Sequence, residues 1–144
     1  MPPRSRSKPR RLFPMTLHPM TEALQRPDTA PILVTVAPHS HATPRGAVTG
    51  AWIMGQLDVA AGLAGRKIAQ GDALILSIKE LTFHAALSAG AEFVIHAELT
   101  RRGNSSFNLF LSAWAEPDRD CSLVMSADVV LVAVDADGKP RKLN

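Results

Sequence analysis

A carboxylate in the middle of an apolar stretch is the residue of this sequence best suited to chemistry. Asp58 lies within residues 50–69 (GAWIMGQLDVAAGLAGRKIA), where Gln56 is the only other polar residue before Arg66. Burying a carboxylate is costly unless it is hydrogen-bonded, paired or neutralised by a raised pKa, so Asp58 is a candidate functional group. The alternative is that Asp58 lies at the solvent edge of a helix or caps a neighbouring loop.

Other patterns that carry chemistry are missing from the sequence. His39 and His41 form a His-x-His pair in a Pro-rich loop, but no clear third metal ligand accompanies them. The sequence has no Gly-x-Ser-x-Gly elbow for Ser-His-Asp catalysis and no Walker or Rossmann glycine pattern. The single cysteine, Cys121, can form neither an internal disulfide nor a cysteine-built zinc site. We therefore expect no metal or redox cofactor, and a cytoplasmic location.

The segment that carries Asp58 is predicted to be one long helix. Residues 50–69 are rich in helix-forming Ala, Leu, Met and Gln, and Gly71 provides a stop. Nearly every face of this helix is apolar or small, so we expect protein to wrap it, with a sheet as the packing surface. Gly55, Gly62 and Gly65 lower helix propensity but allow another backbone to approach closely.

The rest of the ordered chain has the period of two that is typical of β-strands. The predicted strands cover residues 32–36, 74–83, 93–100, 107–113 and 123–134. A turn at residues 101–106 (RRGNSS) joins two of the long strands into an antiparallel hairpin. One strand, a buried helix and then a series of antiparallel strands predict an α+β fold in which a curled sheet wraps the helix.

Composition limits the class of protein. The 144 residues are 46% hydrophobic and 20% charged, which suits one globular domain. Residues 1–26 hold six basic side chains and one acidic one, whereas the remainder holds ten basic and twelve acidic side chains. We therefore predict a basic, disordered tail over residues 1–30 and a domain over residues 31–144. The alternatives for the tail are an organelle-targeting peptide and an arm that binds nucleic acid or a membrane surface. The slightly acidic charge of the domain argues against nucleic-acid binding. The sequence contains no apolar run of about 18 residues, so we predict no membrane span.

Four segments in order resemble one known family over the whole domain. They are GAWIMGQLD (50–58), LTF (81–83), RGNSS (102–106) and VAVDADGKPR (132–141). Together they resemble the hot-dog-fold acyl-CoA thioester hydrolases, particularly the short bacterial branch, from about Ile32 to Leu143. The resemblance implies a long helix inside a curled antiparallel sheet. It also implies a homodimer that assembles further into a tetramer or hexamer.

The resemblance implies roles for residues at the helix. The carboxylate at the position of Asp58 carries thioester hydrolysis in that family, either as a general base on water or as a nucleophile on the carbonyl carbon. The developing oxyanion needs donors, and the backbone N–H groups of Gly50 and Ala51 would lie at the positive, unpaired start of the helix. Which role Asp58 takes stays open at this point.

The spacing of these groups predicts a site shared between two chains. Gly50 and Asp58 are eight residues apart, which is about 12 Å along one helix and too far for both to contact one carbonyl group. If both act, Gly50 of one chain faces Asp58 of another, and a symmetric dimer has two such sites.

The implied coenzyme A site includes a turn and two single residues. In the resembling family the turn matching Arg101, Arg102, Gly103, Asn104, Ser105 and Ser106 contributes to coenzyme binding, although the segment also fits an ordinary charged hairpin turn. Thr82 is a candidate for positioning substrate or water, or for satisfying local backbone. Arg45 stands where the family has an Asn; it could not position water in the same way but could hold a phosphate.

The sequence therefore predicts an acyl-CoA thioester hydrolase that releases free coenzyme A and a carboxylic acid. The alternative is a hot-dog module that binds acyl-CoA without hydrolysing it, which the replacement of Asn by Arg45 favours.

Overall fold

The computed structural model describes residues 24–116 and 121–144 of the chain. Its elements run in the order β1 (Leu33–Val36), a short 3₁₀ helix η1 (His39–His41), α1 (Gly50–Ala69), β2 (Ala73–Phe83), β3 (Glu92–Arg102), β4 (Ser106–Ala115) and β5 (Ser122–Ala133). The helix has the predicted bounds, and each predicted strand is present within three residues of its expected ends.

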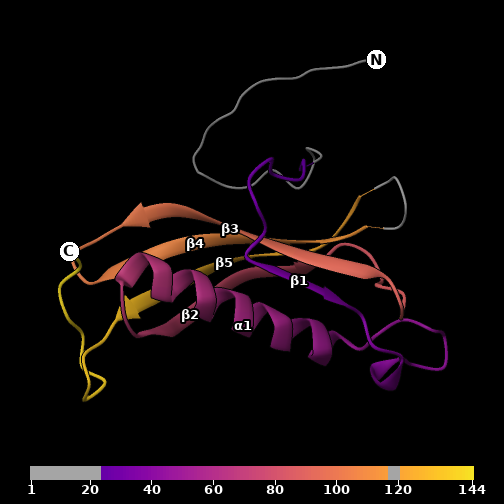
Figure 1. The fold of residues 1–144 in the computed structure, drawn as a ribbon, viewed down its shortest axis with the longest axis horizontal. Helices are drawn as coiled ribbons and strands as arrows, with labels where there is room; N and C mark the ends of the chain where they lie inside the picture. Colours follow the sequence, from indigo (N-terminus) through magenta and orange to yellow (C-terminus); the bar gives the residue numbers. More distant parts are fainter. Residues whose placement is uncertain (1–23, 117–120) are drawn as a thin grey trace.

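The five strands form one antiparallel sheet with α1 lying along one face (Figure 1). The strand order is β1-β3-β4-β5-β2, so β1 and β2 are the two edges. This arrangement confirms the predicted α+β fold with a curled sheet around one long helix. No helix within the described residues is long and apolar enough to span a membrane.

One face of α1 packs into the core of the domain. Ile53, Leu57 and Ala61 are buried against strand residues such as Phe93 and Leu131. A Cβ added at Gly65 would lie 2.9 Å from Cδ2 of Leu131, so the absence of a side chain lets the helix approach β5. This close approach was predicted for all three helical glycines but holds for Gly65 alone, because added Cβ atoms at Gly55 and Gly62 would meet nothing within 4 Å.

The opposite face of α1 is uncovered in the single chain. Met54, Val59 and Leu63 are each more than 40% exposed. On the neighbouring edge strand β2, the apolar side chains of Leu76 and Ile78 are exposed as well. The expectation that protein wraps the whole helix is therefore wrong for one chain, because a five-stranded sheet covers only one side of it.

The outer face of the sheet, away from α1, carries the segment that precedes β1 (Figure 1). Residues 24–27 lie against strands β3 and β4, where Arg26 forms an ion pair with Glu116 and donates a hydrogen bond from Nε to Nε2 of His96 at 3.0 Å. Residues 1–23 lie outside the described part of the chain, so the predicted disorder of the tail stays a prediction for them.

Candidate active site

The first turn of α1 presents two unpaired backbone donors. Thr49 is the N-cap, and its side-chain oxygen accepts a hydrogen bond from the N–H of Trp52 at 3.2 Å. The N–H of Ile53 donates to the carbonyl oxygen of Thr49. Within the described part of the chain, the N–H groups of Gly50 and Ala51 have no partner, and both residues are exposed. The helix start can therefore donate two hydrogen bonds to a negatively charged oxygen.

Asp58 lies on the uncovered face of the same helix. Its side chain is exposed in the single chain and forms no ion pair or hydrogen bond with another described residue. Because Gly50 and Asp58 belong to one unbroken helix, they are about 12 Å apart along its axis, as predicted. No single carbonyl group can contact both within one chain.

An aromatic side chain missed at the sequence level lies beside the helix start. Phe83 ends β2, and its ring atom Cζ would lie 3.5 Å from a Cβ added at Gly50. The sequence contained Phe83 within the LTF segment, but nothing in the alternation of that strand indicated where the ring would point. A β-bulge just before Phe83 breaks the alternation of the strand and sets the direction of the ring.

The turn after β3 lies at the opposite end of α1 from Gly50. The N–H of Leu143 donates to the carbonyl oxygen of Asn104, and Nη2 of Arg141 donates to the carbonyl oxygen of Ala69, the last residue of the helix. The turn, the C-terminal segment and the helix end therefore form one region. Since α1 has 20 residues, this region is about 30 Å from Gly50 along the helix.

The two arginines of this turn are exposed but already bonded. Arg101 donates to Oδ1 of Asn108 and to Oγ of Ser106, at 2.9 and 2.8 Å. Arg102 donates to the carbonyl oxygen of Asn144 at 2.6 Å. The N–H of Gly103 donates to the carbonyl oxygen of Ser106, and the carbonyl oxygen of Ser105 accepts from Ala133. These bonds hold the guanidinium groups at the surface in defined positions.

The remaining two predicted residues lie apart from the turn. Arg45 is exposed in the loop before α1, and its backbone N–H donates to Oγ1 of Thr43. The hydroxyl of Thr82 donates to the carbonyl oxygen of Glu80 at 3.2 Å, within its own strand. Thr82 pairs with Ser126 across the sheet, and its neighbour Phe83 is the residue that reaches the helix start.

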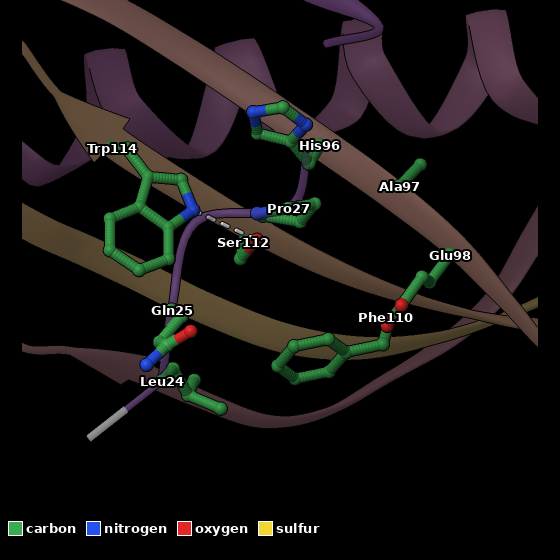
Figure 2. Close-up of a pocket in the computed structure, with 9 residues that line it drawn as sticks. All are labelled: Leu24, Gln25, Pro27, His96, Ala97, Glu98, Phe110, Ser112 and Trp114. Carbon is green, nitrogen blue, oxygen red and sulfur yellow. Dashed lines mark hydrogen bonds between the residues drawn. The ribbon is translucent and has the colours of Figure 1, made fainter. Parts of the chain in front are cut away.

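A second feature is a cavity of about 160 Å³ on the outer face of the sheet (Figure 2). Figure 2 shows it between the segment before β1 and the strands β3 and β4; its walls include Leu24, Pro27, His96, Phe110, Ser112 and Trp114. Ser112 accepts a hydrogen bond from Nε1 of Trp114 at 3.0 Å. Asp58 and Gly50 belong to the helix on the other face, so this cavity is separate from the candidate active site.

The buried histidine of this cavity predicts a pH dependence of stability. Burial, and then the positive charge of Arg26, lower the pKa of His96 from its ordinary value of 6.5. The carboxylates on this face of the sheet include Glu98 in the cavity wall, Glu116, which pairs with Arg26, Asp128, which lies opposite Phe110 on β5, and Glu92, which is on the same face of β3 as His96. The folded chain thus binds a proton at His96 less readily than the unfolded chain does. The stability that neutral His96 contributes is therefore complete above pH 6.5 and is lost as the pH falls through the lowered pKa.

We therefore expect the free energy of unfolding, measured with urea, to decrease from about pH 7.5 to about pH 5.5. His96→Gln retains an acceptor for Arg26 but does not titrate, so this variant should show a smaller decrease. An equal decrease in both proteins would show that another group is responsible.

No group of three or more His, Cys, Asp or Glu side chains in residues 24–116 and 121–144 is arranged to hold a metal ion.

A long helix on a curled antiparallel sheet, with unpaired donors at its start and a carboxylate on its open face, defines the hot-dog class of thioesterase fold. The family described as the thioesterase superfamily matches residues 45–122. Among solved structures, the hexameric hotdog-fold thioesterase Cj0915 of Campylobacter jejuni superposes with a TM-score of 0.75 at 27% identity, covering 83% of this chain and 93% of that one.

Two curated relatives match this chain over nearly the whole length of each relative. An uncharacterised acyl-CoA thioester hydrolase of Buchnera aphidicola (subspecies Baizongia pistaciae) is 30% identical, with 83% of this chain and 92% of the relative covered. The acyl-CoA thioester hydrolase YciA of Salmonella typhimurium is 28% identical, with 86% and 97% covered. The chain belongs to the thioesterase superfamily, which confirms the family predicted from its sequence.

Proposed function

We propose that this chain hydrolyses acyl-CoA thioesters to free coenzyme A and a carboxylic acid. The observation that carries the proposal is the pair of unpaired N–H groups, on Gly50 and Ala51, at the start of the helix whose open face bears Asp58. Two relatives that match almost end to end are described as acyl-CoA thioester hydrolases, which supports the same substrate class.

Each group has a defined task in the proposed reaction. The N–H groups of Gly50 and Ala51 donate hydrogen bonds to the carbonyl oxygen of the thioester as its negative charge develops, and the positive end of the helix dipole adds to this stabilisation. Asp58 either removes a proton from the attacking water or attacks the carbonyl carbon itself, after which water hydrolyses the resulting anhydride. In both routes the thiolate of coenzyme A leaves. The reaction as proposed uses no metal or redox cofactor.

We propose that the site is assembled across a homodimer. The separation of about 12 Å between Gly50 and Asp58 requires two chains if both groups act on one carbonyl. The exposed apolar side chains of α1, and separately those of the edge strand β2, supply surfaces that a second copy can cover. The relative from Campylobacter jejuni is described as hexameric, which supports further assembly of dimers.

The proposed coenzyme site also requires a neighbouring chain. The turn from Arg101 to Ser106 is about 30 Å from Gly50 within one chain, so it can join a site at Gly50 only from a neighbouring chain. The exposed guanidinium groups of Arg101 and Arg102 suit phosphate oxygens. Arg45, exposed just before the helix start, is a further proposed phosphate contact. A cytoplasmic location, where acyl-CoA is available, completes the proposal.

The second candidate function is acyl-CoA binding without hydrolysis. Arg45 favours it, because a bulky charged side chain replaces the Asn of the resembling family near the helix start. Release of free thiol from short, medium and long acyl-CoA substrates separates the two functions. Thiol release is the expected result, whereas saturable binding of acyl-CoA without any release would support the binding module.

A further inference from the structure

The strand that leads to the helix start contains a strained bulge. Lys79 pairs with Asp128 and Thr82 pairs with Ser126, so three steps along β2 correspond to two steps along β5. Within this bulge Glu80 has a φ of 51°, in the left-handed region that residues other than glycine rarely adopt. The hydroxyl of Thr82 donates to the carbonyl oxygen of Glu80 and closes the bulge.

The bulge redirects the residue that follows it. An extra residue in one strand bends that strand and changes the direction of its side chains, and such bulges are frequent near active sites. Here the redirected residue is Phe83, whose Cζ would lie 3.5 Å from a Cβ added at Gly50. The next residue is fixed too, since the backbone N–H of His84 donates to the carbonyl oxygen of Val124 and its Nε2 bonds Oγ of Ser126 at 2.8 Å.

Core packing does not account for this placement. The side chain of Phe83 is 46% exposed, whereas the other described phenylalanines, Phe93, Phe107 and Phe110, are each at most 7% exposed. A large apolar ring held half in solvent, by a strained backbone, indicates a surface that meets another molecule. The start of α1 lies beside this ring at Gly50, and the N–H groups of Gly50 and Ala51 there are unpaired among the described residues. A carbonyl group bound at the helix start would therefore be the part of a substrate nearest the ring.

We propose that Phe83 determines acyl specificity by limiting substituents on the carbon next to the thioester carbonyl. This inference rests on the proposed function, in which the carbonyl oxygen is held at Gly50 and Ala51. With the oxygen held there, an unbranched acyl chain passes along the edge of the ring and gains dispersion contacts. A methyl branch on the first carbon after the carbonyl collides with the ring. The enzyme should therefore prefer unbranched acyl groups.

The test compares two substrates of equal carbon number, butyryl-CoA and isobutyryl-CoA, by the rate of thiol release. Phe83→Ala should raise the ratio of kcat/KM for isobutyryl-CoA to that for butyryl-CoA about tenfold over wild type. Phe83→Leu, which keeps an apolar side chain, should raise it less and covers the case in which the alanine variant does not fold. A loss of correctly folded enzyme lowers both rates equally and leaves the ratio unchanged.

Leu99→Ala is the matched control, because Leu99 is also 46% exposed but lies near the far end of β3. This variant should leave the ratio as in wild type. An unchanged ratio in active Phe83 variants would overturn the role of Phe83 and leave the proposed hydrolysis intact. A wild-type enzyme that hydrolyses neither substrate, nor any longer acyl-CoA, would overturn the proposed function and this inference with it.

Discussion

Asp58→Asn will lower kcat for acyl-CoA hydrolysis by about 10²- to 10⁴-fold while leaving acyl-CoA binding in place. Asparagine has nearly the same shape as aspartate, but its amide can neither take a proton from water nor attack the carbonyl carbon. The substitution should not disturb the fold, because Asp58 is exposed in the chain and bonds to no other described side chain. The loss should appear in kcat and not in KM.

Thiol release and calorimetric titration with acyl-CoA measure the two effects separately. Asp137→Asn is a matched control, since it makes the same chemical change at an exposed aspartate near the C-terminus. This control should retain the wild-type rate. If Asp58→Asn hydrolyses acyl-CoA as fast as wild type does, a different group performs the chemistry.

Two inactive variants will restore activity when they are combined in one oligomer. The first is Asp58→Asn, and the second is Gly50→Pro, which removes one N–H donor and should itself cost about 10²- to 10³-fold in kcat. Proline is well tolerated at the first position of a helix, and Thr49 before it already has the extended backbone that a following proline requires (ψ 153°). The helix should therefore form in both variants.

The recovery has a definite size if Gly50 and Asp58 of different chains meet. A dimer with one chain of each variant has one site with both substitutions and one site with neither. Random mixing at equal concentrations makes about half of the dimers mixed, so roughly one quarter of wild-type activity should return after co-refolding. Each variant refolded alone is the control. The absence of recovery, with mixed dimers confirmed by mass spectrometry, would show that Gly50 of one chain and Asp58 of the other do not serve the same site.

The fold followed from the sequence because its signals are local. The long helix begins at Gly50 and ends at Ala69 as predicted, since the helix formers and the stop near Gly71 act within a few residues of each other. Alternation of apolar residues likewise depends on neighbours two positions apart, and it located β2, β3 and β4, whereas a short β-rich run between two prolines located β1.

The arrangement around the helix start depends on contacts between segments that are distant in the sequence, so it could not be predicted from local patterns. No glycine marks the bulge at Glu80, so the direction of Phe83 follows only from the pairing of β2 with β5. The contact of Arg26 with His96 joins residues 70 positions apart, and a basic tail gave no signal for it. The open face of α1 was also missed, because helix composition shows that a surface is apolar but not whether its own chain covers it.

The uncovered apolar face of α1 has a thermodynamic consequence. If a second copy covers Met54, Val59 and Leu63, the free energy released by burying them is available only to associated chains. Folding and association are then linked by mass action, and the folded fraction depends on how much protein is present. The midpoint of thermal unfolding should accordingly rise with protein concentration, and cells that hold few copies of the chain would hold a larger share of it unfolded.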